Sequence, residues 1–121
     1  MGIGILNAAL TTSEDFEEHH GHALAEGEDV HLVYRTIRDY IAFTEMRILY
    51  VNAQGITGRK KEYLSVPYRA INAFAIETAG TFDLDAEVKI FISGHTPIKF
   101  RLARNVDTRK LQNLLTEAIN M

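Results

Sequence analysis

The feature that most constrains the fold is an alternation of apolar and polar residues that recurs in short segments between residues 29 and 103. Successive side chains of a strand point to opposite faces, so this period of two indicates strands with one face buried. Glycine-containing turns such as Gly55 and Gly58 separate the segments, and Pro67 ends one of them or places it at a sheet edge. We predict seven antiparallel strands, over residues 30–37, 39–45, 46–52, 63–68, 70–78, 86–93 and 97–103. Residues 70–78 are apolar on both faces, which predicts a buried strand.

Two segments have a helical period instead. Near the C-terminus, Asp107 is a suitable cap for a helix of about 13 residues that carries one apolar stripe, formed by Leu111, Leu114, Leu115, Ala118 and Ile119. A lone helix of that length is marginal in water, so it has to pack on the strands. The sequence therefore predicts a mostly β fold, a small antiparallel barrel or orthogonal sandwich with one open end plugged by the C-terminal helix.

The N-terminal part of the chain is acidic and is expected to be a short helix. Residues 1–30 contain seven acids and no lysine or arginine, whereas residues 31–121 contain nine acids and 13 bases. Thr and Ser precede an acidic first turn within residues 12–26, as at a capped helix start. We expect Phe16, His20, Ala23 and Leu24 to share one face, with Gly27 as the stop. The predicted organisation is an acidic helical segment, 1–27, followed by one domain, 28–121.

Composition excludes several classes of protein. The chain has 121 residues, no cysteine and a formal charge of −3. The negative charge argues against a general nucleic-acid binder. The absence of cysteine fits a reducing cytoplasm. No apolar run approaches the roughly 20 residues of a membrane span, and residues 1–10 match neither a secretory signal nor an anchor.

The chain closely resembles the bacterial pleckstrin-homology-like (PH-like) domain family over about residues 28–120. The resemblance is carried, in order, by the stretches "RDYIAFTEMRIL", "QGITGRKKEYLSVPY" and "ETAGTFDLDAEVKIFISG" and by the C-terminal helix. It implies a seven-stranded PH-like barrel with a C-terminal helix. It also implies a module without catalytic activity that forms ring-shaped homo-oligomers. No inositol-phosphate motif carries over, because the first turn is short here and holds only Arg35, Arg38 and Asp39.

Three acids at every second position, Asp83, Asp85 and Glu87, are the first candidate site. In a strand they share one face, opposite the apolar row Phe82, Leu84, Ala86, Val88 and Ile90. The favoured interpretation is a solvated strand face. A contact between subunits is the alternative, and a calcium site lacks the further ligands and the Gly-centred turn that it needs.

The run Arg59, Lys60 and Lys61 is the second candidate. It is a solubilising loop, an anion or lipid headgroup site, or a contact with acids of a neighbouring subunit. Tyr63, Ser65 and Tyr68 mark the third candidate, an edge strand through which copies of the chain pair head to tail. Tyr63, Tyr68 and Phe74 are alternatively core residues.

Catalysis and metal binding find little support in the sequence. His19 and His22 share a helix face, but two ligands do not make a site. Ser65 has no nucleophile-elbow motif around it, and there is no cysteine nucleophile. We therefore expect no enzyme activity, no cofactor and no metal. The expected partners are copies of the chain itself and other proteins, with membrane contact as a further option and no nucleic acid.

Overall fold

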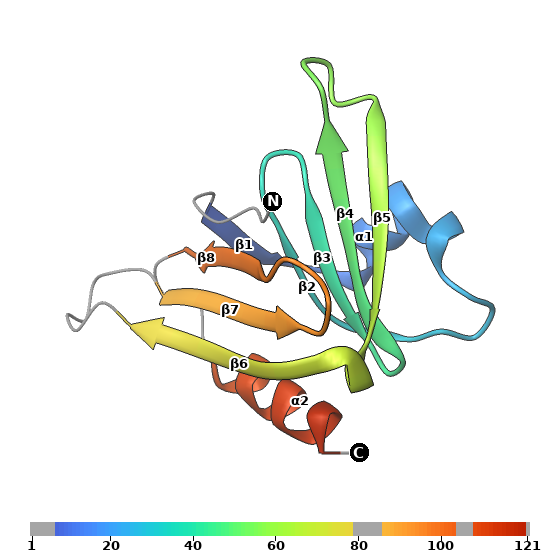
Figure 1. The fold of residues 1–121 in the computed structure, drawn as a ribbon. Coiled ribbons are helices and arrows are strands. Elements are labelled where there is room, and N and C mark those ends of the chain that lie inside the picture. Colours follow the sequence, from blue (N-terminus) through green and yellow to red (C-terminus); the bar gives the residue numbers. More distant parts are fainter. Residues whose placement is uncertain (1–6, 79–85, 104–107, 121) are drawn as a thin grey trace. The chain divides into compact units, whose positions relative to one another are not determined.

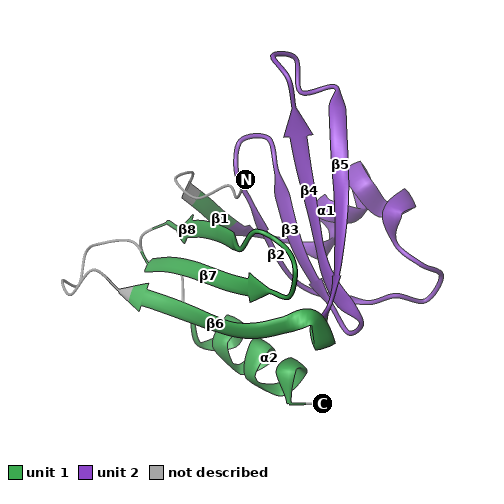
Figure 2. Cartoon of the chain, in the orientation of Figure 1, with its two compact units in different colours: residues 1–9, 68–121 green, residues 10–67 purple. Residues whose placement is uncertain are grey.

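A computed structural model of the chain describes residues 7–78, 86–103 and 108–120. The chain divides into two compact units, which Figure 2 distinguishes by colour. Unit 1 contains residues 1–9 and 68–121, and unit 2 contains residues 10–67. Each unit has its own antiparallel strands and its own helix (Figure 1).

Unit 2 is a four-stranded meander that is preceded in the sequence by a short helix. Its strands follow the order β5-β4-β3-β2, and each pairs antiparallel with its neighbour in the chain. The elements are α1 (Ser13–His20), the 3-10 turn η1 (Gly21–Ala23), β2 (Val30–Arg35), β3 (Tyr40–Thr44), β4 (Arg47–Gln54) and β5 (Lys60–Pro67). The antiparallel strands predicted for this half of the chain are confirmed. The first of them ends before the predicted limit, at Arg35, and the fourth begins earlier, at Lys60.

The core of unit 2 lies between α1 and one face of this sheet. It is a cluster of buried residues from both, namely Phe16, Val33, Tyr40, Ala42, Leu49 and Val51. Ala23 and Leu24 pack against the cluster, and His20 is buried as well. The predicted apolar face of the N-terminal helix is thus confirmed. The helix itself is shorter than predicted, since it ends at His20, with Gly21 as its C-cap, and continues only as the 3-10 turn Gly21–Ala23. The cap is Thr12, whose hydroxyl accepts a hydrogen bond from the Asp15 N–H at 3.0 Å.

Unit 1 contains the remaining strands, in the order β1-β8-β7-β6. The elements are β1 (Asn7–Thr11), the 3-10 turn η2 (Tyr68–Ala70), β6 (Ile71–Thr78), β7 (Ala86–Ile92), β8 (Ile98–Leu102) and α2 (Arg109–Ile119). The described part of the chain therefore has eight strands instead of the seven predicted. The additional one, β1, starts in unit 1, where Asn7 and Ala8 pair parallel with β8. It was missed because residues 1–10 are almost uniformly apolar and show no alternation.

The C-terminal helix packs against β6 and η2, with Leu111 and Leu115 fully buried. Its N-cap is Thr108, so Asp107, the predicted cap, is one position too early and lies outside the described residues. Strand β6 differs from its prediction as well. Ala73 is exposed and Phe74 half-buried, because β6 is the terminal strand of its sheet and has β7 as its one strand partner among the described residues. Neither helix within the described ranges has the length and apolar character that a membrane span requires.

Candidate functional site

The two turns at one end of the unit 2 sheet carry four bases. Antiparallel order places the β2–β3 turn and the β4–β5 turn at the same end, and the β3–β4 turn at the opposite end. We call residues 36–39 and 55–61 the basic tip. It contains Arg38, Arg59, Lys60 and Lys61 and one acid, Asp39. Arg59 precedes β5, whereas Lys60 and Lys61 are its first two residues, so the predicted basic loop is partly strand.

Arg38 joins the two turns of the basic tip. Its guanidinium donates a hydrogen bond to the carbonyl oxygen of Gly55 at 2.6 Å. It also lies against Gly58, where an added Cβ would come within 3.4 Å of two of its nitrogens. Gly55 and Gly58 both have positive φ, of 79° and 71°, which glycine adopts without strain. The sequence places Arg38 in the first turn and gives no signal that connects it with the run at 59–61.

Asp39 also connects the β2–β3 turn to β4, through a buried side chain. Its side chain is 4% exposed and accepts a hydrogen bond from the Ala53 N–H at 2.9 Å. Burial raises the pKa of the Asp39 carboxyl, and the nearby Arg38 charge opposes that shift. Because this acid faces inward, the exposed charge of the basic tip is positive. Ion pairs in the described part of the chain use none of its four bases, and Lys61 bonds only to the Gly58 carbonyl oxygen, at 3.0 Å.

Strand β5 is the terminal strand of the unit 2 sheet. It pairs with β4 along its whole length, from Lys60 opposite Gln54 to Pro67 opposite Arg47. Of the three residues predicted for an edge strand, Tyr63 and Ser65 lie on β5 and are exposed. Tyr68 follows the strand in η2 and is buried. Ser65 accepts a hydrogen bond from Arg47 on the neighbouring strand at 3.0 Å.

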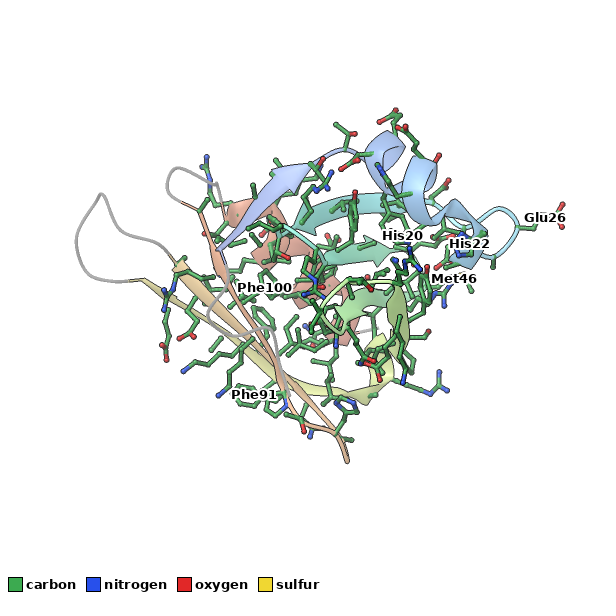
Figure 3. The ribbon with its side chains drawn as sticks, turned by 90° about the horizontal axis from the view of Figure 1, so that it is seen from above. His20, His22, Glu26, Met46, Phe91 and Phe100 are labelled. Atoms are coloured by element: carbon green, nitrogen blue, oxygen red, sulfur yellow. The ribbon has the colours of Figure 1, made fainter. Side chains whose placement is uncertain are left out.

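Tyr63 also connects β5 to the N-terminal helix. Its hydroxyl lies 3.1 Å from Nδ1 of His20 and 3.3 Å from Nε2 of His22. The His20 ring stacks edge-on against Tyr40, with centroids 5.0 Å apart, and contacts Phe16. Figure 3 shows His20 and His22 at the end of the helix. Burial, together with the nearby Lys61 and neighbouring histidines, lowers the pKa of His20.

A second anchor holds the start of the helix. The Asp15 carboxylate accepts hydrogen bonds from Thr11 and Arg35, each at 2.8 Å, and from the Tyr40 hydroxyl at 3.2 Å. These bonds outweigh its desolvation and lower the pKa of Asp15. His19 lies 3.3 Å from the same carboxylate. The described residues contain no group of three or more His, Cys, Asp or Glu side chains suited to holding a metal ion.

Only one of the three acids of the predicted acidic row lies within the described residues. Asp83 and Asp85 lie outside the described residues, and Glu87 lies on β7 opposite Arg101 of β8. The alternation holds where β7 is described, because Val88 and Ile90 are fully buried and Glu87 and Lys89 are partly exposed. Lys89 bonds Glu77 of β6 at 2.9 Å.

A buried ion pair in unit 2 had no signal in the sequence. Both carboxylate oxygens of Glu28 accept hydrogen bonds from Arg47 at 2.8 Å. Thr44 and the Ala25 N–H complete the site at 2.7 and 2.9 Å. The Arg47 bonds hold the pKa of Glu28 at about 2. Periodicity cannot find such a pair, because its members lie 19 residues apart.

Comparison with known proteins agrees with this architecture. A family model described as the bacterial PH domain matches residues 2–119. Among curated proteins, the chain is similar to the uncharacterised protein YjqA of Bacillus subtilis (strain 168). The two are 48% identical over 88 residues, which is 73% of this chain and 70% of YjqA. The uncharacterised protein YozO of the same organism is 32% identical over 78% of this chain and 81% of its own length.

Two solved structures extend the similarity to three dimensions. A DUF1696 family protein with a pleckstrin-homology domain from Shewanella loihica PV-4 is 39% identical, with a TM-score of 0.80, over 93% of this chain and 97% of that one. A pleckstrin homology domain from Shewanella amazonensis SB2B is 37% identical, with a TM-score of 0.68, over 90% and 89% of the two chains. The predicted PH-like fold is confirmed, and the chain belongs to the bacterial PH-domain family.

Proposed function

We propose that the chain is an interaction module without catalytic activity that assembles with copies of itself into a closed ring. The observation that carries this proposal is the position of β5 at the end of its sheet. Residues 60–63 are exposed, and the side of the strand away from β4 has no strand partner among the described residues. Such an edge presents N–H and C=O groups to another strand.

A ring requires two different surfaces that meet head to tail. Strand β6 is the terminal strand of unit 1, and within the described ranges its one strand partner is β7. Pairing of β5 from one chain with β6 from the next would satisfy both edges. The basic run Arg59, Lys60 and Lys61 would then add an attraction to the acidic row Asp83, Asp85 and Glu87 of a neighbour.

The mass in solution, measured by light scattering after size exclusion at low and at high salt, tests the assembly. We expect a discrete multimer at both salt concentrations, because backbone pairing depends little on ionic strength. A multimer that dissociates in high salt would assign the contact to the charged rows instead of the edge. A monomer under all conditions would contradict self-assembly.

Proline substitutions on β5 test the edge itself. In an antiparallel pair, neighbouring residues alternate between facing the partner strand and facing outward with their backbone N–H. Lys61→Pro and Glu62→Pro therefore form a matched pair at exposed positions. One of these two variants removes a hydrogen bond to β4 and lowers the stability of the fold, while the other removes only an N–H that points away from β4. We expect the variant that keeps the bond to β4 to be a folded monomer. If both proline variants form a multimer of the same mass as the parent, β5 is not the contact between subunits.

A second candidate function is the binding of anions by the basic tip. The observation that favours it is the bond from Arg38 to Gly55, which adds a fourth base to the predicted run. The test is salt-dependent binding to anionic vesicles by the parent chain and by the triple variant Arg59→Ala, Lys60→Ala, Lys61→Ala. We expect the variant to lose most of the binding, because each base near an anionic surface contributes about 1 kcal/mol. Equal binding by the two proteins would reject this function.

A further inference from the structure

Two histidines and a tyrosine of unit 2 bring three donor atoms close together. The Tyr63 hydroxyl lies 3.1 Å from Nδ1 of His20 and 3.3 Å from Nε2 of His22. The two imidazole rings lie next to each other at the end of α1, with centroids 6.3 Å apart (Figure 3). Each of them meets the Tyr63 ring edge-on, with centroids 5.6 Å apart. One phenol oxygen and two imidazole nitrogens therefore converge on a short space.

The end of α1 allows both histidines to reach the same tyrosine. In a continuous α-helix, residues two positions apart do not face each other. Here the α-helix ends at His20, and His22 belongs to the 3-10 turn that follows, so this restriction no longer applies. The sequence indicates His19 and His22 as neighbours on a helix face, and the structure pairs His22 with His20 instead. His20 is buried, whereas His22 and Tyr63 are exposed, so the group is open to solvent on one side.

The two distances to the phenol oxygen are those found between the ligands of a metal ion. In a tetrahedral zinc site with bonds of about 2.0–2.1 Å, neighbouring donor atoms lie about 3.3–3.4 Å apart. Imidazole suits Zn²⁺ and Cu²⁺, and a phenol becomes a ligand when the ion displaces its proton. No group of three His, Cys, Asp or Glu side chains within the described ranges can hold a metal ion. The oxygen of Tyr63 is what completes a set of three donors here.

We propose that Nδ1 of His20, Nε2 of His22 and the oxygen of Tyr63 bind a divalent ion of the Zn²⁺ and Cu²⁺ class, with water in the remaining position. Both imidazoles bind in their neutral form, and the hydroxyl proton of Tyr63 passes to the solvent. The bound ion connects the N-terminal helical segment to β5. The site depends neither on self-assembly nor on anion binding by the basic tip.

The charges near the site favour the neutral imidazole and limit the affinity for a cation. Burial lowers the pKa of His20, which keeps its imidazole in the form that a metal ion requires. The positive charge of Lys61 acts on His20 and repels a divalent ion. Arg35 repels it less, because its guanidinium is paired with the Asp15 carboxylate at 2.8 Å. We therefore expect a weaker site than one with a carboxylate or thiolate ligand.

Calorimetric titration of the untagged chain with ZnCl₂ at neutral pH tests the site. We expect one ion to bind per chain. The variants His22→Gln and Tyr63→Phe change exposed side chains and should keep the fold. Each should bind Zn²⁺ about tenfold or more weakly, because it removes one of three donors. The matched control is His95→Gln, an exposed histidine of unit 1, which should bind like the parent. A parent that does not bind Zn²⁺, or an unchanged affinity in either test variant, would overturn the proposal.

Two further measurements identify the ligands. His19 contacts the Asp15 carbonyl oxygen and the Tyr40 hydroxyl, at 3.0 and 3.3 Å, so His19→Gln should keep the affinity of the parent for Zn²⁺. An equal loss in His19→Gln and His22→Gln would assign the ion to that pair and overturn the proposed set. Titration with CuCl₂ reports on the phenol, because a Cu²⁺–phenolate bond gives a charge-transfer band in the visible spectrum. We expect this band in the parent and not in Tyr63→Phe. Binding of Cu²⁺ by the parent without the band would show that Tyr63 is not a ligand.

Discussion

Glu28 shows how a single buried carboxylate can organise a connection that has no regular structure. Its side chain is fully enclosed, and its two oxygens receive four hydrogen bonds from Ala25, Thr44 and Arg47. Arg47 also donates to the carbonyl oxygen of Ala23 at 2.9 Å. The segment between η1 and β2 is therefore fastened to the β3–β4 turn at both ends.

We predict that Glu28→Gln destabilises the chain by about 2–3 kcal/mol, because it leaves the Arg47 charge without its partner in a largely buried site. Urea unfolding measures the change. The control is Glu26→Gln, since Glu26 is exposed and projects from the molecule in Figure 3. That variant should stay within about 0.5 kcal/mol of the parent. Equal stability of the two variants would show that the pair contributes nothing.

The same pair has a defined pH window. The pKa of Glu28 is about 2 in the folded chain, against an ordinary value of 4.5. A lowered pKa stabilises the fold fully above pH 4.5, and this stabilisation is lost as the pH falls towards 2. The difference corresponds to roughly 3 kcal/mol. The stability gap between the parent and Glu28→Gln should therefore close over this window.

At the scale of the element, α1 is the N-terminal acidic segment and has two separate attachments to the sheet. Asp15 binds Arg35 and Tyr40 near its start, and His20 packs against Tyr40 and Tyr63 near its end. The exposed side of the helix keeps the remaining acids, Glu14, Glu17 and Glu18. The helix thus covers the core of unit 2, and one of its four acids neutralises a base of the sheet.

The attachment at His20 should respond to mild acid. Burial lowers the pKa of His20 below 6.5, so as the pH falls the imidazole is protonated in the unfolded chain before it is protonated in the folded chain. Stability should fall as the pH drops below 6.5 and level off once the folded pKa is passed. The groups that face His20 reinforce this direction, because Lys61, Arg35, His19 and His22 are all basic.

We predict that His20→Phe removes this dependence, so that its urea midpoint is the same at pH 5 and at pH 7. The slope is the readout, since the substitution also removes the bond to Tyr63 and changes the absolute stability. His31→Gln is the control, because His31 is exposed on β2 and its variant should keep the slope of the parent. The window lies above that of Glu28, so the two effects can be measured separately. A parent whose midpoint does not move between these pH values would refute the prediction.

At the scale of the whole molecule, periodicity predicted the fold well because the strands carry the alternation that burial of one face requires. Periodicity gave wrong predictions where contacts with other elements, and not the local pattern, determine an element or its limits. β1 is a strand because β8 offers it a parallel partner, and α1 ends at His20, short of the predicted limit at residue 26. For β6, an apolar composition did not reveal a position at the edge of the sheet.

The candidate site was predictable only in parts. The run Arg59, Lys60 and Lys61 was visible as a cluster in the sequence, and so was Tyr63 beside a strand-ending proline. Their connections were not visible. Arg38 reaches Gly55 across 17 residues, and Tyr63 reaches His20 across 43. Contacts of that separation depend on the register of the sheet, which one-dimensional patterns do not specify.

Strand β5 begins inside the basic tip, at Lys60, and continues as the terminal strand in the order of the described strands. Pairing of chains along this strand would therefore set the spacing of the tips, one for each subunit. Once one tip is bound, the others act at a high effective concentration, and the overall avidity can exceed that of one tip by orders of magnitude. A weak individual contact would then become a steep response to the density of anionic lipid, which a single chain could not give.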